Sequence, residues 1–258
     1  MQIIYLKMST EKELQESLDA ARAWQEKRLP SSDYIVGLIP ESFIIYLPKE
    51  KVSGDFYWVE AVNEEVLFAV SDCTGHGVTG AMLTVKCFDL LNSALKDYGC
   101  IVPGHILDKV LELLIHDFKN RGNEINEGMD IALCSINGNV LRYSGANNPL
   151  WICRNGIVIE MPATRQGIGL TDVPMPFFTH ETNIESGDVL FLFSDGFQDQ
   201  FGGPGNKKYK VRNFKSLVQK ISEESLIRQE ELLSKEISKW KANEEQNDDI
   251  TIMAIKIQ

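Results

Sequence analysis

Short hydrophobic runs separated by turn signals constrain the fold of this chain most strongly. Residues 43–47, 66–70 and 189–193 are each apolar throughout and bounded by polar or turn residues, as expected of buried strands. Two Asn-Gly pairs, Asn137-Gly138 and Asn155-Gly156, each separate two further strand-like runs. Asn-Gly favours hairpins because a type I′ turn needs positive φ at both central residues. The pattern predicts sheets that are mostly antiparallel.

Helical patterns come in pairs along the same sequence. Apolar residues recur at helical spacing over 79–95 and 103–119, and again over 214–221 and 230–240. A last strand is predicted over 250–257. Strands outnumber helices, so we expect an α+β domain built in layers.

The N-terminal segment has a different pattern. Thr10-x-x-Glu13 matches a capping box, which predicts that a helix begins there, and Pro30 would stop it. The apolar positions at helical spacing between them are Leu14, Leu18, Ala21 and Trp24. This helix either packs on its own domain or connects the domain to a sensor or partner. We therefore divide the chain into a connector or regulatory helix at 1–30 and one domain at 31–258.

The charge and cysteine content exclude several function classes. Lys and Arg total 26 against 37 Asp and Glu, a net charge of −11, which disfavours binding to nucleic acid and to anionic membranes. Apolar runs stay shorter than the roughly 18 residues needed to cross a bilayer, so no direct membrane insertion is expected. The five cysteines have no CxxC spacing and indicate neither a disulfide framework nor a zinc site, so a cytoplasmic protein is expected.

Four segments place an aspartate beside a glycine or at a strand end. They are Ser53-Gly54-Asp55, Ser71–Gly77, Ser194-Asp195-Gly196 and Asn247-Asp248-Asp249. In the second and third, a hydrophobic run leads directly into Ser-Asp, so the carboxylate lies where a buried strand reaches its exposed end. An ionised carboxylate there is costly unless a positive charge neutralises it, and no Lys or Arg adjoins these segments. A divalent cation would neutralise several carboxylates together.

The ligand type favours particular metals. Sites made only of oxygen suit Mg²⁺ or Mn²⁺, and a main-chain carbonyl such as that of Cys73 could complete a shell. Two such ions about 4 Å apart can share a bridging water and hold it for in-line attack on phosphorus. Each segment alone has a simpler interpretation: Asp-Gly is most often a turn, His76 could cap the helix that follows, and the Lys207-Lys208 pair could be solvated surface charge.

Taken together and in this order, the segments resemble the metal-dependent serine/threonine phosphatases of type 2C (PPM), specifically their SpoIIE-like bacterial branch. The matching stretches are 52–58, 72–81, 143–149, 193–200 and 248–251. The resemblance extends from roughly Pro30 to the C-terminus. It implies two antiparallel sheets packed as a sandwich and flanked by helix pairs, with two Mn²⁺ or Mg²⁺ ions at one end.

The resemblance also implies site residues. Asp55 and Asp72 would hold the two ions between them, with the carbonyl of Cys73 as a further ligand. Asp195 and Asp248 would bind one ion from the other side, although the ligand of the last segment could instead be Asp249. These four aspartates, Asp55, Asp72, Asp195 and Asp248, are the predicted catalytic residues. The general-acid role of histidine in the eukaryotic relatives does not carry over simply to His76, because two residues intervene after Asp72.

The implied function is hydrolysis of phosphoserine or phosphothreonine by direct attack of a metal-bridging water, in bacterial signalling. Anti-anti-sigma proteins are frequent substrates in this family. A helix ending in Leu29-Pro30 fits a connector to a sensor module or a homodimer contact. The alternatives are a catalytically silent binding module with the same fold, and a two-metal nuclease, which the acidic charge disfavours.

Overall fold

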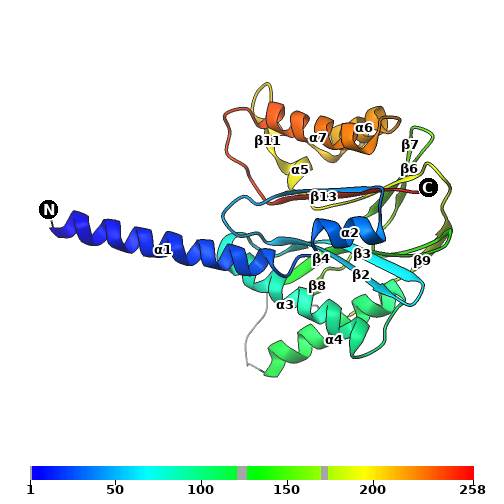
Figure 1. Ribbon diagram of the computed structural model, residues 1–258, viewed down its shortest axis with the longest axis horizontal. Coiled ribbons are helices and arrows are strands. Elements are labelled where there is room, and N and C mark those ends of the chain that lie inside the picture. The colour runs from blue at the N-terminus through cyan, green and yellow to red at the C-terminus, as the bar shows by residue number, and fades with distance from the viewer. Residues whose placement is uncertain (1, 121–126, 170–173) are drawn as a thin grey trace.

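The computed structural model describes residues 2–120, 127–169 and 174–258. Within these residues, two large antiparallel sheets pack face to face (Figure 1). One sheet has the order β1 (Ser42–Leu47), β13 (Ile250–Lys256), β10 (Val189–Phe193), β6 (Leu150–Arg154) and β7 (Ile157–Met161). The other has the order β2 (Asp55–Val62), β3 (Glu65–Cys73), β4 (Gly128–Asn137), β5 (Val140–Ala146) and β9 (His180–Asn183), and β8 (Ile168–Gly169) pairs with β4.

Helices cover both outer faces of this sandwich. In Figure 1, α3 (Gly77–Lys96) and α4 (Pro103–Asn120) lie beneath the β2–β9 sheet, and α6 (Val211–Ile221) and α7 (Leu226–Lys241) lie above the other. The remaining helices are α1 (Gln2–Glu26), α2 (Ser32–Leu38) and the short α5 (Gly196–Asp199). The predicted sandwich with flanking helix pairs is confirmed. The described helices include none that is long and apolar enough to cross a membrane.

Strands in the middle of each sheet are buried on both faces. In β3, Leu67 packs toward α3 and α4, whereas the next residue, Phe68, packs into the layer between the sheets. In β10, Phe191 faces α6 and α7, and Leu192 faces the other sheet. Both sets of side chains are therefore apolar, which explains why these strands appear in the sequence as unbroken hydrophobic runs.

The first helix begins earlier than predicted. It starts at Gln2, so the Thr10-x-x-Glu13 pattern lies inside a helix and the predicted start was wrong. Serine or threonine inside a helix costs only a few tenths of a kcal/mol, so the good helix formers around Thr10 carry the helix through it. In Figure 1 the N-terminal part of α1 projects from the body of the domain.

The two Asn-Gly hairpins differ. Asn155 and Gly156 have φ of 50° and 76° and connect β6 to β7, as a type I′ turn requires. Asn137 instead pairs with Val140, so the first turn is formed by residues 138 and 139, and Gly138 has φ of 56°. The prediction for this turn was therefore wrong by one residue, because a glycine in the first central position suits the type II′ turn.

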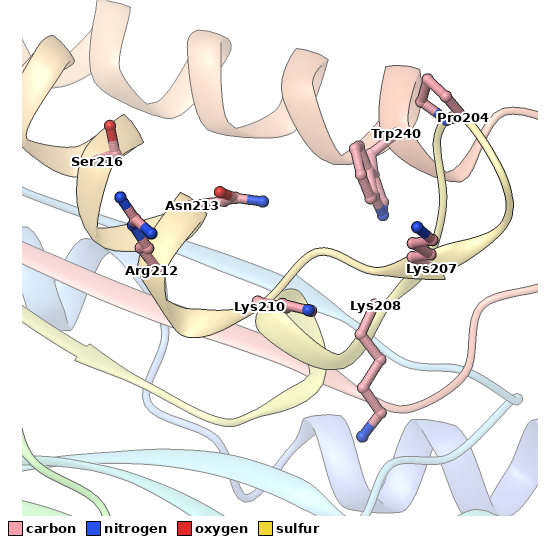
Figure 2. A pocket seen from close by; sticks show the side chains of 8 residues that line it. All are labelled: Pro204, Lys207, Lys208, Lys210, Arg212, Asn213, Ser216 and Trp240. Atoms are coloured by element: carbon pink, nitrogen blue, oxygen red, sulfur yellow. The ribbon is translucent and has the colours of Figure 1, made fainter.

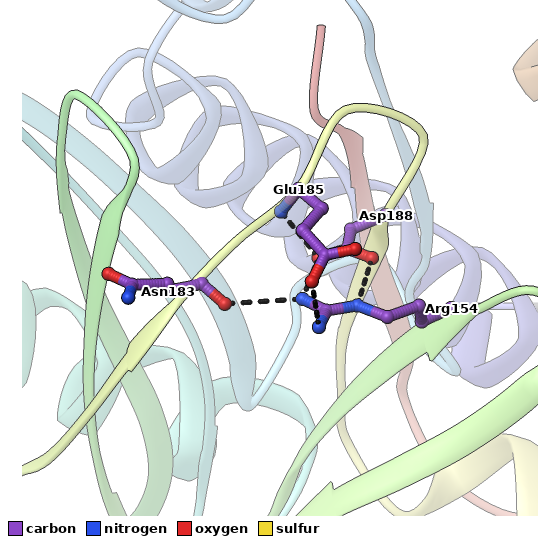
Figure 3. A network of polar contacts seen from close by, with 4 residues as sticks. All are labelled: Arg154, Asn183, Glu185 and Asp188. Atoms are coloured by element: carbon purple, nitrogen blue, oxygen red, sulfur yellow. Dashed lines mark hydrogen bonds and ion pairs between the residues drawn. The ribbon is translucent and has the colours of Figure 1, made fainter.

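An ion pair between the partly exposed Arg154 and the buried Asp188 fixes the turn that precedes β10 (Figure 3). Arg154 Nε and Nη2 donate to the two oxygens of Asp188 at 2.7 and 2.6 Å, and Nη1 donates to Glu185 at 2.7 Å. Asp188 also accepts from the Glu185 backbone N–H at 2.9 Å and is only 1% exposed. The network ties the end of β6 to the turn before β10. The other end of β10 leads into Asp195.

Candidate metal centre

Three aspartates lie in one row at the end of the β2–β9 sheet. Asp55 is the first residue of β2 and pairs in register with Asp72 near the end of β3. Asp72 pairs in register with Asp130 on β4. Residues directly opposite each other on neighbouring strands have their side chains on the same face, with Cβ atoms about 5 Å apart. The sheet therefore sets three carboxylates side by side.

The other sheet supplies two more carboxylates. Asp195 follows the end of β10 and Asp248 precedes the start of β13, and these strands are antiparallel neighbours with Phe193 opposite Ile252. Asp195 and Asp248 thus lie at the same end of their sheet. Their charges both act on Asp72, so the structure brings carboxylates from both sheets within electrostatic reach of one another.

Backbone contacts between glycines hold the loops of this site together. The Cys73 N–H donates to the Gly54 carbonyl at 3.0 Å. A Cβ on Gly80 would collide with the Gly75 carbonyl oxygen and would lie 2.9 Å from Gly54 Cα. A Cβ on Gly54 would also collide with the Gly75 carbonyl. The segments beside Asp55 and Asp72 can approach this closely only because these positions lack side chains.

The acidic side chains are electrostatically unfavourable as the chain alone arranges them. Burial, followed by the charges of Asp55 and Asp195, raises the pKa of Asp72 to about 10. Burial, with a contribution from the Asp248–Asp249 pair, raises the pKa of Asp55 to about 8, although neighbouring hydroxyls oppose the shift. Burial and neighbouring carboxylates raise the pKa of Asp195 to about 6. Asp72 and Asp55 therefore favour the protonated form at neutral pH, and ionising them together requires added positive charge.

The chemistry of these side chains suits the binding of a hard divalent cation. Asp55 is 1% exposed, and its Oδ2 is buried with no hydrogen-bond partner among the described residues. No Lys or Arg in the described ranges forms an ion pair with Asp55, Asp72, Asp195 or Asp248. Carboxylate oxygens in these surroundings favour Mg²⁺ or Mn²⁺.

The side chains nevertheless do not form a complete metal-binding site among the described residues. In the parts of the chain that the structure describes, no three His, Cys, Asp or Glu side chains are arranged to hold a metal ion. The Cys73 thiol is buried toward Cys87, and burial raises its pKa well above the usual range, so the sulfur does not suit a metal ligand. The backbone carbonyl is the group that this residue could offer.

Asp249 has a different environment from Asp248. Its carboxylate accepts the backbone N–H groups of Lys49 and Gly54, both at 2.7 Å, and the residue is only 2% exposed. It therefore ties the segment before β2 to the start of β13. Asp248 is half-buried, and one of its oxygens accepts the N–H of Asp249 at 2.9 Å.

Sequence reasoning missed two residues of this site. Asp130 lies opposite Asp72, and Asn147 Nδ2 donates to Asp130 Oδ1 at 2.8 Å. The available signal was a single charged residue in the otherwise apolar start of β4. His76 occupies the N-cap position of α3, as one interpretation expected, but its side chain makes no capping hydrogen bond; its Nδ1 lies 2.7 Å from Glu50 Oε1 instead.

Comparisons with known proteins agree with the fold. The family described as Stage II sporulation protein E (SpoIIE) matches residues 63–258. The SiaA-PP2C domain of Pseudomonas aeruginosa is similar with a TM-score of 0.88 and 27% identity, over 96% of this chain and 99% of that domain. A search of curated proteins found no match.

More distant structures share the fold. The PP2C phosphatase domain of SpoIIE from Bacillus subtilis, solved with a fragment of its regulatory domain, has a TM-score of 0.68 and 18% identity, over 84% of this chain and 62% of that one. RsbX in complex with magnesium has a TM-score of 0.60 and 17% identity, over 84% of this chain and 94% of that one. This chain therefore belongs to the SpoIIE family of PP2C-type serine/threonine phosphatases.

Proposed function

We propose that this chain is a phosphoprotein phosphatase that depends on two Mn²⁺ or Mg²⁺ ions and hydrolyses phosphoserine or phosphothreonine directly with water. The observation that carries the proposal is the position of Asp55, which pairs with Asp72 in its own sheet, is acted on by the charges of Asp248 and Asp249 from the other, and has a buried Oδ2 with no partner among the described residues. Such a cluster is costly in the free chain, and divalent cations would neutralise it.

The proposed ligands are Asp55, Asp72, the carbonyl of Cys73, Asp195 and Asp248. Asp248 is preferred over Asp249, because the Asp249 carboxylate is already bonded to two backbone N–H groups. When bound, the two cations would supply the charge that activates a water and neutralises the phosphoryl oxygens. The chain's own contribution is to hold its carboxylates in one row on a rigid sheet and to release their protons when the cations bind.

The decisive experiment measures Mn²⁺-dependent phosphate release from a phosphopeptide. Asp72→Asn and Asp195→Asn should each lower release to background while far-UV circular dichroism stays unchanged. The matched control is Asp33→Asn on α2, which is exposed and should behave as the wild type. Full Mn²⁺-dependent activity in both site variants would refute the proposal. Mn²⁺ binding by calorimetry without hydrolysis of any phosphopeptide would instead indicate the silent binding module.

We also propose that α1 is a regulatory connector and that the substrate is a signalling protein of the anti-anti-sigma type. Leu14 and Trp24 on α1 are 58% and 55% exposed, so a sensor module or a second copy of the chain could pack there. All five cysteines are unpaired, which supports a location in the reducing cytoplasm. Removing residues 1–28 should change activity or oligomeric state; if neither changes, the connector proposal is wrong.

A further inference from the structure

A pocket of about 520 Å³ lies between the β11–β12 hairpin (Phe201–Gly202 and Lys207–Lys208), the start of α6 and the end of α7 (Figure 2). Its lining includes four cationic side chains: Lys207, Lys208, Lys210 and Arg212. The whole chain has a net charge of −11, so this concentration of positive charge is contrary to its overall composition. We call it the basic pocket.

Most of this positive charge is not neutralised by the protein. Lys208 pairs with Asp199 at 2.6 Å, but Lys207, Lys210 and Arg212 form no ion pair with any described residue. The positive end of α6 lies here as well. Its first turn contains no acidic residue, and Lys210 at the N-cap position makes no capping hydrogen bond through its side chain. Acidic side chains are favoured at such a position, so the pocket has the charge pattern of an anion site.

The walls of the basic pocket are fixed to the core. Trp240 Nε1 donates to the Gln200 carbonyl at 3.0 Å, and the Gly203 N–H donates to the Trp240 carbonyl at 2.9 Å. The buried Tyr209 ring packs edge-on against both Trp240 and Phe197. The backbone that presents the cations is therefore held in place before a ligand arrives, which lowers the entropic cost of binding.

The basic pocket also adjoins the candidate metal centre. Asp199, the partner of Lys208, is the last residue of the short helix α5, and its N–H donates to the carbonyl of Asp195 at 3.0 Å. The charges of Asp195 and Asp248 both act on Lys208. A polypeptide with its phosphorylated residue at the aspartates could therefore reach the pocket with residues close by in its sequence.

We propose that the basic pocket binds an acidic segment of the phosphoprotein substrate, next to its phosphorylated residue. The inference rests on the proposed function and adds the substrate class: phosphoserine or phosphothreonine with Asp or Glu nearby. A short acidic segment fits better than a long polyanion, because the rest of this acidic chain repels nucleic acid. Arginine and lysine bind carboxylates through charge-assisted hydrogen bonds, which Arg212 can make in pairs.

The test compares kcat/KM of the full chain with Mn²⁺ on matched phosphopeptides, whose flanking residues are either three Asp or three Asn on each side. The wild type should prefer the acidic peptide about tenfold, and the preference should shrink in 0.5 M salt. The double variant Lys210→Gly/Arg212→Ala should bring the preference close to parity. Glycine is chosen because Lys210 has φ of 75°. The control, Lys235→Ala/Lys239→Ala, removes the same charge from exposed positions on α7.

The outcomes separate this inference from the proposed function. Equal kcat/KM for acidic and neutral peptides in the wild type would overturn the inference and leave the phosphatase assignment intact. The same loss of preference in the α7 control would also overturn it, because the effect would then come from net charge. If the wild type hydrolyses neither peptide nor p-nitrophenyl phosphate with Mn²⁺, the proposed function itself fails.

Discussion

Gln25 connects the first helix to the loop that carries Asp55. Its Nε2 donates to the Ser53 carbonyl at 2.7 Å and to Thr84 Oγ1 at 2.8 Å, and its Oε1 accepts the Ser53 N–H at 3.0 Å. Ser53 in turn accepts the Asp55 N–H through its hydroxyl at 3.0 Å. The buried side chain of Gln25 would therefore transmit a displacement of α1 to the loop that carries Asp55.

The Gln25→Ala substitution tests this connection. Gln25 is 6% exposed and Ser53 is fully buried, so the variant leaves the N–H and carbonyl of Ser53 without their partner. An unsatisfied buried polar group costs about 1–3 kcal/mol, so we expect a loss of about 2–4 kcal/mol in the free energy of unfolding. For a chain of this size the loss corresponds to a Tm lower by roughly 5–15 °C. Mn²⁺ should also bind more weakly, because Asp55 loses its support.

Differential scanning calorimetry and titration calorimetry with Mn²⁺ measure the two effects. Arg22→Ala is the control on the same helix: its ion pair with Glu26 is exposed, and its loss should cost at most about 0.5 kcal/mol. The reasoning is refuted if Gln25→Ala keeps both the Tm and the Mn²⁺ affinity of the wild type. A lower Tm with unchanged affinity would mean that Gln25 supports the fold and not the site.

Three further predictions follow from the same structure. Asp188→Ala should lower stability toward urea by about 3 kcal/mol, because it leaves Arg154 without its buried partner, whereas Arg228→Ala breaks only an exposed pair and should cost under about 0.5 kcal/mol. Gly80→Ala should sharply lower Mn²⁺-dependent activity by forcing the site loops apart; wild-type activity would contradict this packing. The pKa of Asp72 is raised, so the folded metal-free chain retains a proton that the unfolded chain loses above about pH 4. Its Tm should therefore fall as pH rises from 5 to 9, and Mn²⁺ should reverse the fall; a metal-free Tm that rises over this range would contradict the assignment.

Much of the fold could be predicted because its signals are local. Continuous apolar runs, helical spacing and one Asn-Gly turn each depend on a few neighbouring residues, and the two pairs of flanking helices and most strands lie close to the predicted ranges. Several elements were missed, among them α2, β2, α5 and β9. The sequence around Asp55 was interpreted only as a possible metal-binding motif, although the strand β2 runs from Asp55 to Val62.

The parts of the site that could not be predicted depend on contacts between segments that are far apart in the sequence. Asp130 joins the cluster only through the register of β4 with β3, which the sequence does not specify. The Lys207-Lys208 pair is exposed, as the interpretation of solvated charge expected, but the sequence did not show that Lys210 and Arg212 line the same pocket. The roles assigned to Asp55, Asp72, Cys73, Asp195 and Asp248 stay predictions until the experiments above are done.

The glycine contacts beside Asp55 and Asp72 also bear on the thermodynamics of metal uptake. Gly54, Gly75 and Gly80 meet through main-chain atoms, so contacts within the protein itself fix the backbone of these loops. Binding would then reorient a few carboxylates while the loop backbone stays in place, and little conformational entropy would be lost. If the proposed ions bind, the chain would act as a preorganised receptor, and the spacing of a rigid backbone would set its selectivity among cations.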